Sequence, residues 1–212
     1  MNSPADRKGF FISFEGGEGA GKSTQANILA AHLKALGREV LLCRDPGGTS
    51  IGEKIRGILL DREHQELAPR TELLLYLASR AQLVSESIAP ALAAGRVVIS
   101  DRFHHSTLAY QGGARELDMK SIARMNLFAT DGLLPDITFL MDLPPAEGFA
   151  RKSGGGKDRM EGQGDEFHAR VGQAFRELAK AEPERVVCLD ARRPIEELAA
   201  EIRERVGKLL GK

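Results

Sequence analysis

A glycine-rich segment near the N-terminus carries the most specific chemical signal in the chain. Residues 16–23 match the pattern G-x-x-x-x-G-K-[ST], with an apolar run before them and a helix-like stretch after them. Glycines let the backbone curl so that several N–H groups point at one anion, and a helix start adds positive partial charge. The sequence therefore predicts a nucleotide-phosphate loop formed by Gly16, Gly17, Glu18, Gly19, Ala20, Gly21, Lys22, Ser23 and Thr24.

Four side chains suit a nucleotide that carries a metal ion. Lys22 supplies a cation for the terminal phosphates, and the Ser23 hydroxyl is placed to bind Mg²⁺. Asp101 ends an apolar run and is expected to hold the same ion, directly or through water, although acidic residues at strand ends are also common. Arg102 follows directly, and its planar guanidinium suits a phosphate group.

A basic, glycine-rich segment occupies residues 151–159. It is either a solvated loop or a mobile lid, at about residues 150–162, that closes over ATP. Phosphoryl transfer needs positive charge on the moving group and exclusion of water, and a glycine-hinged basic lid provides both. We therefore favour the lid.

Five apolar runs are expected to form the strands that position these side chains: residues 10–15, 39–44, 96–100, 137–142 and 185–190. The runs are continuous rather than alternating, which is typical of strands buried on both faces of a parallel sheet. Helices are expected at 71–92, 117–128, 165–181 and 194–210, the last with Pro194 in its first turn. The sequence predicts one α/β domain over residues 1–212, a doubly wound five-stranded parallel sheet flanked by helices, with ligands at the carboxyl ends of the strands.

Composition restricts the partners of the protein. The 30 Lys and Arg residues balance the 30 Asp and Glu residues, which argues against a nucleic-acid binder. No apolar run approaches the roughly 20 residues that span a bilayer, so no membrane partner is expected. The N-terminal segment lacks the apolar region of a signal peptide, and Cys43 and Cys188 are interpreted as buried reduced thiols, so the prediction is a cytoplasmic protein.

Residues 101–112 resemble the motif D-R-[FYH]-x-x-S-x-x-A-[FY] of thymidylate kinases. Residues 15–23, 44–49, 76–82 and 158–161 match other motifs of that family in the same order, so the resemblance covers nearly the whole chain. It implies a fold similar to P-loop nucleoside monophosphate kinases and ATP-dependent phosphorylation of dTMP to dTDP, for dTTP biosynthesis. It also implies Mg²⁺ with ATP as donor, and a homodimer.

The resemblance further implies an acceptor site. Arg80 and Arg102 would hold the dTMP phosphate, Tyr76 would stack on thymine, and Tyr110 would crowd the sugar 2′ position. Without the resemblance, Tyr76 is nearly as well explained as a core aromatic, and Arg56 is explained equally well as part of a solvated helix face. The full set of implied dTMP contacts is Glu18, Arg44, Arg56, Tyr76, Arg80, Arg102, Ser106, Thr107, Tyr110 and Gln111.

Glu18 is unusual because a carboxylate inside an anion-binding loop should repel phosphate. It should therefore point toward the acceptor, and the resemblance places it near the sugar 3′-hydroxyl. Positions 17–20 contain no Arg or Lys, and family members of that type use a cation from the lid. Glycines stand at 154–156 where arginines are usual, so the catalytic cation of the lid could be Arg151, Lys152, Lys157 or Arg159. We favour Arg151 and Arg159 as catalytic residues, together with Lys22 and Arg102.

His104 and His105 are interpreted as loop residues without a metal role, since no third nitrogen or sulfur ligand is near in sequence.

A kinase for another nucleoside monophosphate would use the same loop and lid. A nucleotide-switch NTPase is the alternative from another class, but the chain lacks the Asn-Lys-x-Asp guanine reader and that function leaves residues 101–111 unexplained.

Overall fold

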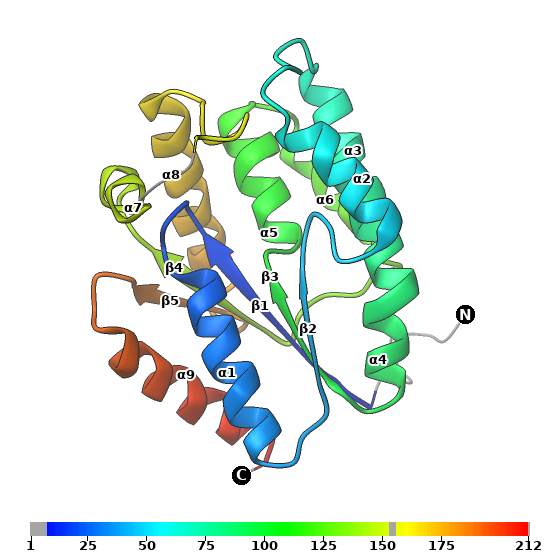
Figure 1. The fold of residues 1–212 in the computed structure, drawn as a ribbon, viewed down its shortest axis with the longest axis vertical. Helices are drawn as coiled ribbons and strands as arrows, with labels where there is room; N and C mark the ends of the chain where they lie inside the picture. Colours follow the sequence, from blue (N-terminus) through cyan, green and yellow to red (C-terminus); the bar gives the residue numbers. More distant parts are fainter. Residues whose placement is uncertain (1–7, 153–155, 212) are drawn as a thin grey trace.

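The structure, a computed structural model, describes residues 8–152 and 156–211. The N-terminal segment considered for a signal peptide (1–7) and residues 153–155 of the expected lid lie outside these ranges. Five parallel strands form one sheet, as the sequence predicts, and the structure shows their order to be β2-β3-β1-β4-β5 (Figure 1). They are β1 (Phe10–Gly16), β2 (Val40–Arg44), β3 (Val97–Asp101), β4 (Ile137–Asp142) and β5 (Val186–Asp190).

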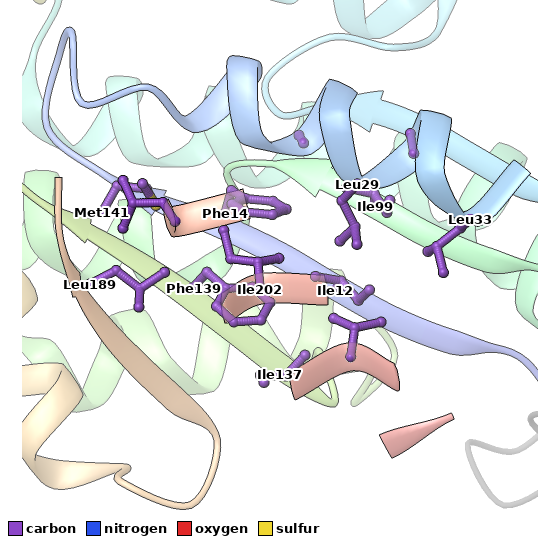
Figure 2. Close-up of a cluster of buried hydrophobic side chains, with 14 of the residues drawn as sticks. Ile12, Phe14, Leu29, Leu33, Ile99, Ile137, Phe139, Met141, Leu189 and Ile202 are labelled. Atoms are coloured by element: carbon purple, nitrogen blue, oxygen red, sulfur yellow. The ribbon is translucent and has the colours of Figure 1, made fainter. Parts of the chain in front are cut away.

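One face of the sheet is covered by α1 (Lys22–Ala35) and α9 (Ile195–Leu209). Their apolar side chains interlock with those of the central strands, as Figure 2 shows for Leu29 and Ile202 against Ile12 and Phe14. Fully burying each such side chain contributes roughly 1.5–3 kcal/mol. This face anchors the phosphate loop, because β1 and α1 are the two elements that the loop joins.

The opposite face is covered by one long helical segment and by two shorter units. The long segment is α3 (Pro69–Leu83), the π-helix η2 (Val84–Ile88) and α4 (Ala89–Ala93). Beside it lie α5 (His104–Thr107), which continues into the π-helix η3 (Leu108–Ala114), and α8 (Asp165–Ala181). Two helices pack outside on α3, namely α2 (Ser50–Leu60) and α6 (Met119–Ala129), while α7 (Pro145–Arg151) follows β4. None of the helices in the described ranges is long and apolar enough to cross a bilayer.

Several details differ from the sequence-based expectations. The helix expected at 71–92 contains a π-turn, because Pro90 lacks the N–H that an α-helix would use there. Pro194 is the N-cap of α9 rather than a residue of its first turn. β2 and β5 are edge strands with exposed positions, so Cys188 is exposed rather than buried, and Cys43 is half-buried. His104 and His105 lie on α5 instead of a loop.

The strand register brings the site residues to one edge of the sheet. Phe14 of β1 and Arg44 of β2 both lie opposite Asp101 of β3. Side chains alternate along a strand, so Ile12 and Phe14 face α1 while Glu15 faces the side where α5 begins. The carboxyl ends of β1, β2 and β3 therefore supply the loop, two arginines and two carboxylates to one place.

Candidate active site

The phosphate loop connects β1 to α1 and depends on glycine at two positions. Gly19 and Gly21 have φ angles of 66° and 85°, in the left-handed region that favours glycine. Gly19 also approaches Gly148 of α7 so closely that a Cβ on Gly19 would meet the Gly148 carbonyl. A Cβ on Gly148 would likewise meet the carbonyl of Glu18. The loop therefore rests directly on the helix that leads into the expected lid.

Lys22 and a pair of oxygen ligands lie at the open side of this loop. The buried Lys22 ammonium donates a hydrogen bond of 2.6 Å to the Gly17 carbonyl. Burial and then the charge of Arg102 lower the pKa of Lys22 to about 8, outweighing the carboxylates of Glu18 and Asp101. The Ser23 hydroxyl donates to the Asp101 carboxylate, although the two residues are 78 positions apart. The fold thus pairs the two side chains expected to hold Mg²⁺.

A cavity of about 280 Å³ opens beside the loop. Lys22, Ser23 and Asp101 line its loop side. Every residue expected from the sequence to contact dTMP also lines it: Glu18, Arg44, Arg56, Tyr76, Arg80, Arg102, Ser106, Thr107, Tyr110 and Gln111. The tertiary structure therefore gathers five separate sequence segments around one space.

The Glu18 side chain lines this cavity, where it contacts Arg102 and Tyr110. Its Oε1 lies 2.5 Å from Nη2 of Arg102 and accepts a 3.2 Å hydrogen bond from the Tyr110 hydroxyl. Burial alone would raise the pKa of Glu18, but Arg102, Lys22 and Lys152 outweigh it and lower the pKa to about 2. The carboxylate is ionised at neutral pH and neutralises part of the cationic cluster.

Arg102 connects the loop with the cavity. Its Nη1 donates to the Gly16 carbonyl at 2.7 Å, and its Cζ lies 5.4 Å from the centre of the Tyr110 ring. Its φ of 71° is unusual for a residue with a side chain, and such strain is concentrated at functional sites. Two backbone contacts hold this conformation: the Arg102 N–H donates to the Phe14 carbonyl, and the Ser100 hydroxyl donates to the Arg102 carbonyl.

Glu15 is a buried residue of the site that sequence reasoning missed. Its carboxylate accepts hydrogen bonds from the Phe103 N–H at 2.9 Å and from the Ser106 hydroxyl at 2.5 Å. Burial raises its pKa against the lowering effects of His105 and Ser106. An acidic residue at the end of an apolar strand was the available signal. Glu15 fixes the turn that holds Arg102 on one side and Ser106 on the other.

Arg80 lies at the bottom of the cavity with 1% of its surface exposed. Its Nε is 2.5 Å from Asp45 Oδ2, and Nη1 donates to Thr107 and to Asn126, both at 2.5 Å. Nη2 donates to the Phe103 carbonyl, so four of the five guanidinium N–H groups have protein partners. Sequence reasoning did not assign Asp45, although it lies in the matched segment 44–49, and nothing in the pattern of α6 marked Asn126.

The outer cavity residues also have defined partners. Nη2 of Arg44 lies 2.8 Å from Glu53, and Nη1 of Arg56 donates to the Pro46 carbonyl at 2.9 Å. Arg56 therefore lines the cavity instead of extending into solvent from α2. Gln111 donates to the buried Glu72 at 2.9 Å, while Tyr76 is half-buried, and burial raises the pKa of its hydroxyl.

The two arginines favoured from the sequence as cations of the expected lid do not line the cavity. Nη1 of Arg151 donates to the Ala191 carbonyl at 2.9 Å, beyond the end of β5. Arg159 is 3% exposed, and its Nη2 lies 2.7 Å from the buried Glu72 carboxylate. Of the four cations expected in the lid, Lys152 lines the cavity; it pairs with Glu161 and lies 3.9 Å from Glu18. Lys157 lies over the Phe149 ring.

An anion-binding loop and a separate cationic cavity meet at Arg102, an arrangement suited to two anionic substrates that react with each other. The fold and the site together define a P-loop kinase that acts on a phosphorylated acceptor.

Residues 14–202 match the family model described as thymidylate kinase. Thymidylate kinase of Leifsonia xyli is 49% identical over 208 residues, which cover 97% of this chain and 98% of that protein. That of Caldanaerobacter subterraneus is 50% identical over 183 residues, covering 86% and 88%. The crystal structure of thymidylate kinase from Ehrlichia chaffeensis superposes with a TM-score of 0.77 at 32% identity, covering 93% and 98%.

The chain belongs to the thymidylate kinase family. This confirms the resemblance found in residues 101–112 and the fold expected from it. The family's reaction is the transfer of the ATP γ-phosphoryl group to dTMP, giving dTDP and ADP.

Proposed function

We propose that this chain phosphorylates dTMP with ATP on the phosphate loop and dTMP in the adjoining cavity. The observation that carries the proposal is the position of Arg102, which contacts both the loop carbonyl of Gly16 and the cavity side chain Glu18. A guanidinium there brings an acceptor phosphate in line with the ATP γ-phosphoryl group and offsets the repulsion between the two anions. The acceptor phosphate is already ionised at neutral pH, so the reaction needs no general base.

Ser23 and Asp101 fit a Mg²⁺ site because they place a hydroxyl and a carboxylate oxygen together at the start of α1. Bound Mg²⁺ would neutralise charge on the β- and γ-phosphates. Lys22 would hold the same phosphates from the other side of the loop.

Acceptor selectivity is proposed to depend on rigid aromatic side chains. Tyr110 packs against Phe167 and Phe175 with ring centres 6.2 Å apart in both pairs, and its hydroxyl is held by Glu18. A wall held in this way would exclude a ribose 2′-hydroxyl. Tyr76 would stack on the base, while Thr107 and Gln111, themselves fixed by Arg80 and Glu72, would present polar groups to its edge.

For the lid, we assign different functions to Lys152 and Arg159. Lys152 is the cation that would reach the transferred phosphoryl group, because it lines the cavity and is 42% exposed. Arg159 would anchor the end of the lid, since its guanidinium is held by Glu72 and by the Leu59 carbonyl at 2.8 Å. Closure of residues 150–162 over ATP would then pivot on this anchor.

A homodimer in the cytoplasm is part of the proposal. Large apolar side chains are exposed on α3 and α6, which pack against each other: Leu74 is 54% and Phe128 is 91% exposed. A second copy of the chain would cover such a surface. Sedimentation of the full chain, compared with a Phe128→Lys variant, tests this part separately from activity.

Turnover with a panel of monophosphates tests the function. We expect dTMP to be the best acceptor, with ADP formation dependent on it. Equal turnover of dUMP, dCMP or dGMP would overturn the base-reading assignment and favour another monophosphate kinase. ATP hydrolysis that ignores dTMP would favour the nucleotide switch.

A further inference from the structure

A cluster of three potential metal ligands lies where α5 begins, outside the residues that line the acceptor cavity. His104 and His105 come from the first turn of α5, and Glu182 caps the end of α8. One ligand atom from each residue lies within 4.8 Å of the other two. Both histidines are at least 95% buried, and their rings lie against each other with centres 3.9 Å apart.

Three of the four histidine ring nitrogens in this cluster lack a good hydrogen bond to the described part of the protein. Nδ1 of His104 and both ring nitrogens of His105 are buried without a hydrogen bond from or to protein atoms. Nε2 of His105 is 3.5 Å from Glu182 Oε1, which is ion-pair distance rather than a good hydrogen bond. Buried imidazoles normally have both nitrogens satisfied. The cluster therefore presents unused lone pairs that point to a ligand.

The charges around the cluster are balanced. Glu15 and Glu182 lie near His105, whereas Arg185 pairs with Glu182 Oε2 and Arg80 acts on His104. Arg185 binds only Oε2 of the Glu182 carboxylate and leaves Oε1 facing the histidines. A partner such as Arg185, outside the set of ligands, can orient a metal-binding carboxylate. Burial, then His105, Arg80 and Arg185, lower the pKa of His104 well below its usual range.

We propose that His104, His105 and Glu182 bind one borderline transition-metal ion, Zn²⁺ in the first instance. Two imidazoles and a carboxylate are a donor set that Zn²⁺ accepts, with water in the fourth position. Bonds of about 2.0–2.2 Å require ligand atoms about 3.5 Å apart, so the cluster must contract by about 1 Å. Glu182 can supply this movement because its side chain is 27% exposed.

An ion at this site would tie α5 to the end of α8. The two histidines lie between Arg102 and Thr107 in the sequence, so the ion would hold the segment that lines the acceptor cavity without touching either substrate.

The test is Zn²⁺ binding by the full chain after treatment with EDTA and dialysis, measured by calorimetry in millimolar Mg²⁺, which competes for the oxygen ligands Ser23 and Asp101. We expect one Zn²⁺ per chain, with a Kd of about 1 μM or lower. His105→Gln and Glu182→Gln should each weaken binding by about 10- to 100-fold. Co²⁺ should give the visible absorption bands of a four-coordinate site in the wild type, and lose them in these variants.

Two control variants separate this site from adventitious binding. His64→Gln removes an exposed histidine that also lies beside a glutamate, with 3.8 Å between His64 and Glu66, and Cys188→Ser removes the exposed thiol. Both should bind Zn²⁺ as the wild type does. Glu182→Gln is the variant of choice if His105→Gln does not fold, because Glu182 is partly exposed. Absence of stoichiometric binding, or binding that survives Glu182→Gln and is lost in a control variant, would overturn the proposal.

Discussion

The Glu18 carboxylate lies 2.5 Å from the Arg102 guanidinium, which joins the phosphate loop to the cavity proposed for the acceptor. This contact explains how a carboxylate is tolerated in an anion-binding loop. Arg102, Lys22 and Lys152 stabilise its charge, and their effect exceeds the cost of burial. The same ion pair leaves Arg102 Nη1 on the loop carbonyl, so the guanidinium is already positioned before an acceptor binds.

Replacing Arg102 with alanine should impair acceptor use far more than donor binding. Charge-assisted hydrogen bonds are worth about 1.5–3 kcal/mol. We therefore expect a higher dTMP KM and a lower kcat, so that kcat/KM for dTMP falls by about 10- to 100-fold. ATP affinity, measured by calorimetry, should change little. Arg38→Ala, which removes an exposed arginine beyond α1, is the control. Loss of ATP affinity in Arg102→Ala would assign Arg102 to the donor site.

The lowered pKa of Lys22 predicts that ATP affinity depends on pH. Its folded-state pKa of about 8 lies below the usual value, so the ammonium is present below pH 8 and is lost as the pH rises. Mg²⁺·ATP affinity should therefore fall above about pH 8, by at most about tenfold per pH unit for one proton. Calorimetry between about pH 6.5 and 9.5 measures this dependence.

Matched variants identify the titrating group. Arg102 lowers the pKa of Lys22 and Glu18 raises it, so Arg102→Ala should move the midpoint up and Glu18→Gln should move it down. Lys22→Ala should remove the dependence and reduce phosphoryl transfer at least about 100-fold while the protein still folds. An affinity that is flat with pH in the wild type, or a normal rate in Lys22→Ala, contradicts the assignment.

Glu15→Gln should affect both stability and acceptor binding. The amide replaces one of the two oxygens that accept from the Phe103 N–H and the Ser106 hydroxyl, which leaves buried donors poorly paired. We expect the free energy of unfolding to fall by about 1–3 kcal/mol and the dTMP KM to rise, with ATP affinity preserved. Urea unfolding and steady-state kinetics measure these effects, with the exposed Glu147→Gln as control. Wild-type stability together with a wild-type dTMP KM would exclude a positioning role for Glu15.

Arg159→Ala and Lys152→Ala should give opposite patterns. Removing Arg159 leaves the buried Glu72 short of one partner, so the free energy of unfolding should fall by about 3 kcal/mol. Removing the partly exposed Lys152 should change stability by less than about 0.5 kcal/mol but lower kcat at least about tenfold. The Lys157→Ala variant is the control for lid charge. If Arg159→Ala lost kcat at full stability, Arg159 would be the catalytic cation as the sequence first suggested.

The phosphate loop, the parallel sheet and the family could be predicted from the sequence because each depends on local patterns. Continuous apolar runs mark buried strands, and the glycines at 19 and 21 are needed for left-handed backbone. The partners of Arg80 could not be predicted in this way. Asp45, Thr107 and Asn126 come from three separate segments, and only the packing of α3 against the end of β2, α5 and α6 brings them together.

The sequence by itself determined which chemical groups are available: a phosphate loop, an aspartate after an apolar strand, and a glycine-rich segment with several cations. The tertiary structure decided which of them face each other. Arg159 carries the same charge as Lys152, but the buried Glu72 holds Arg159 and leaves Lys152 at the cavity. His104 and His105 acquire a third potential ligand only because α8 ends beside α5. Charge and donor type are properties of a residue, whereas direction and burial depend on how distant elements pack.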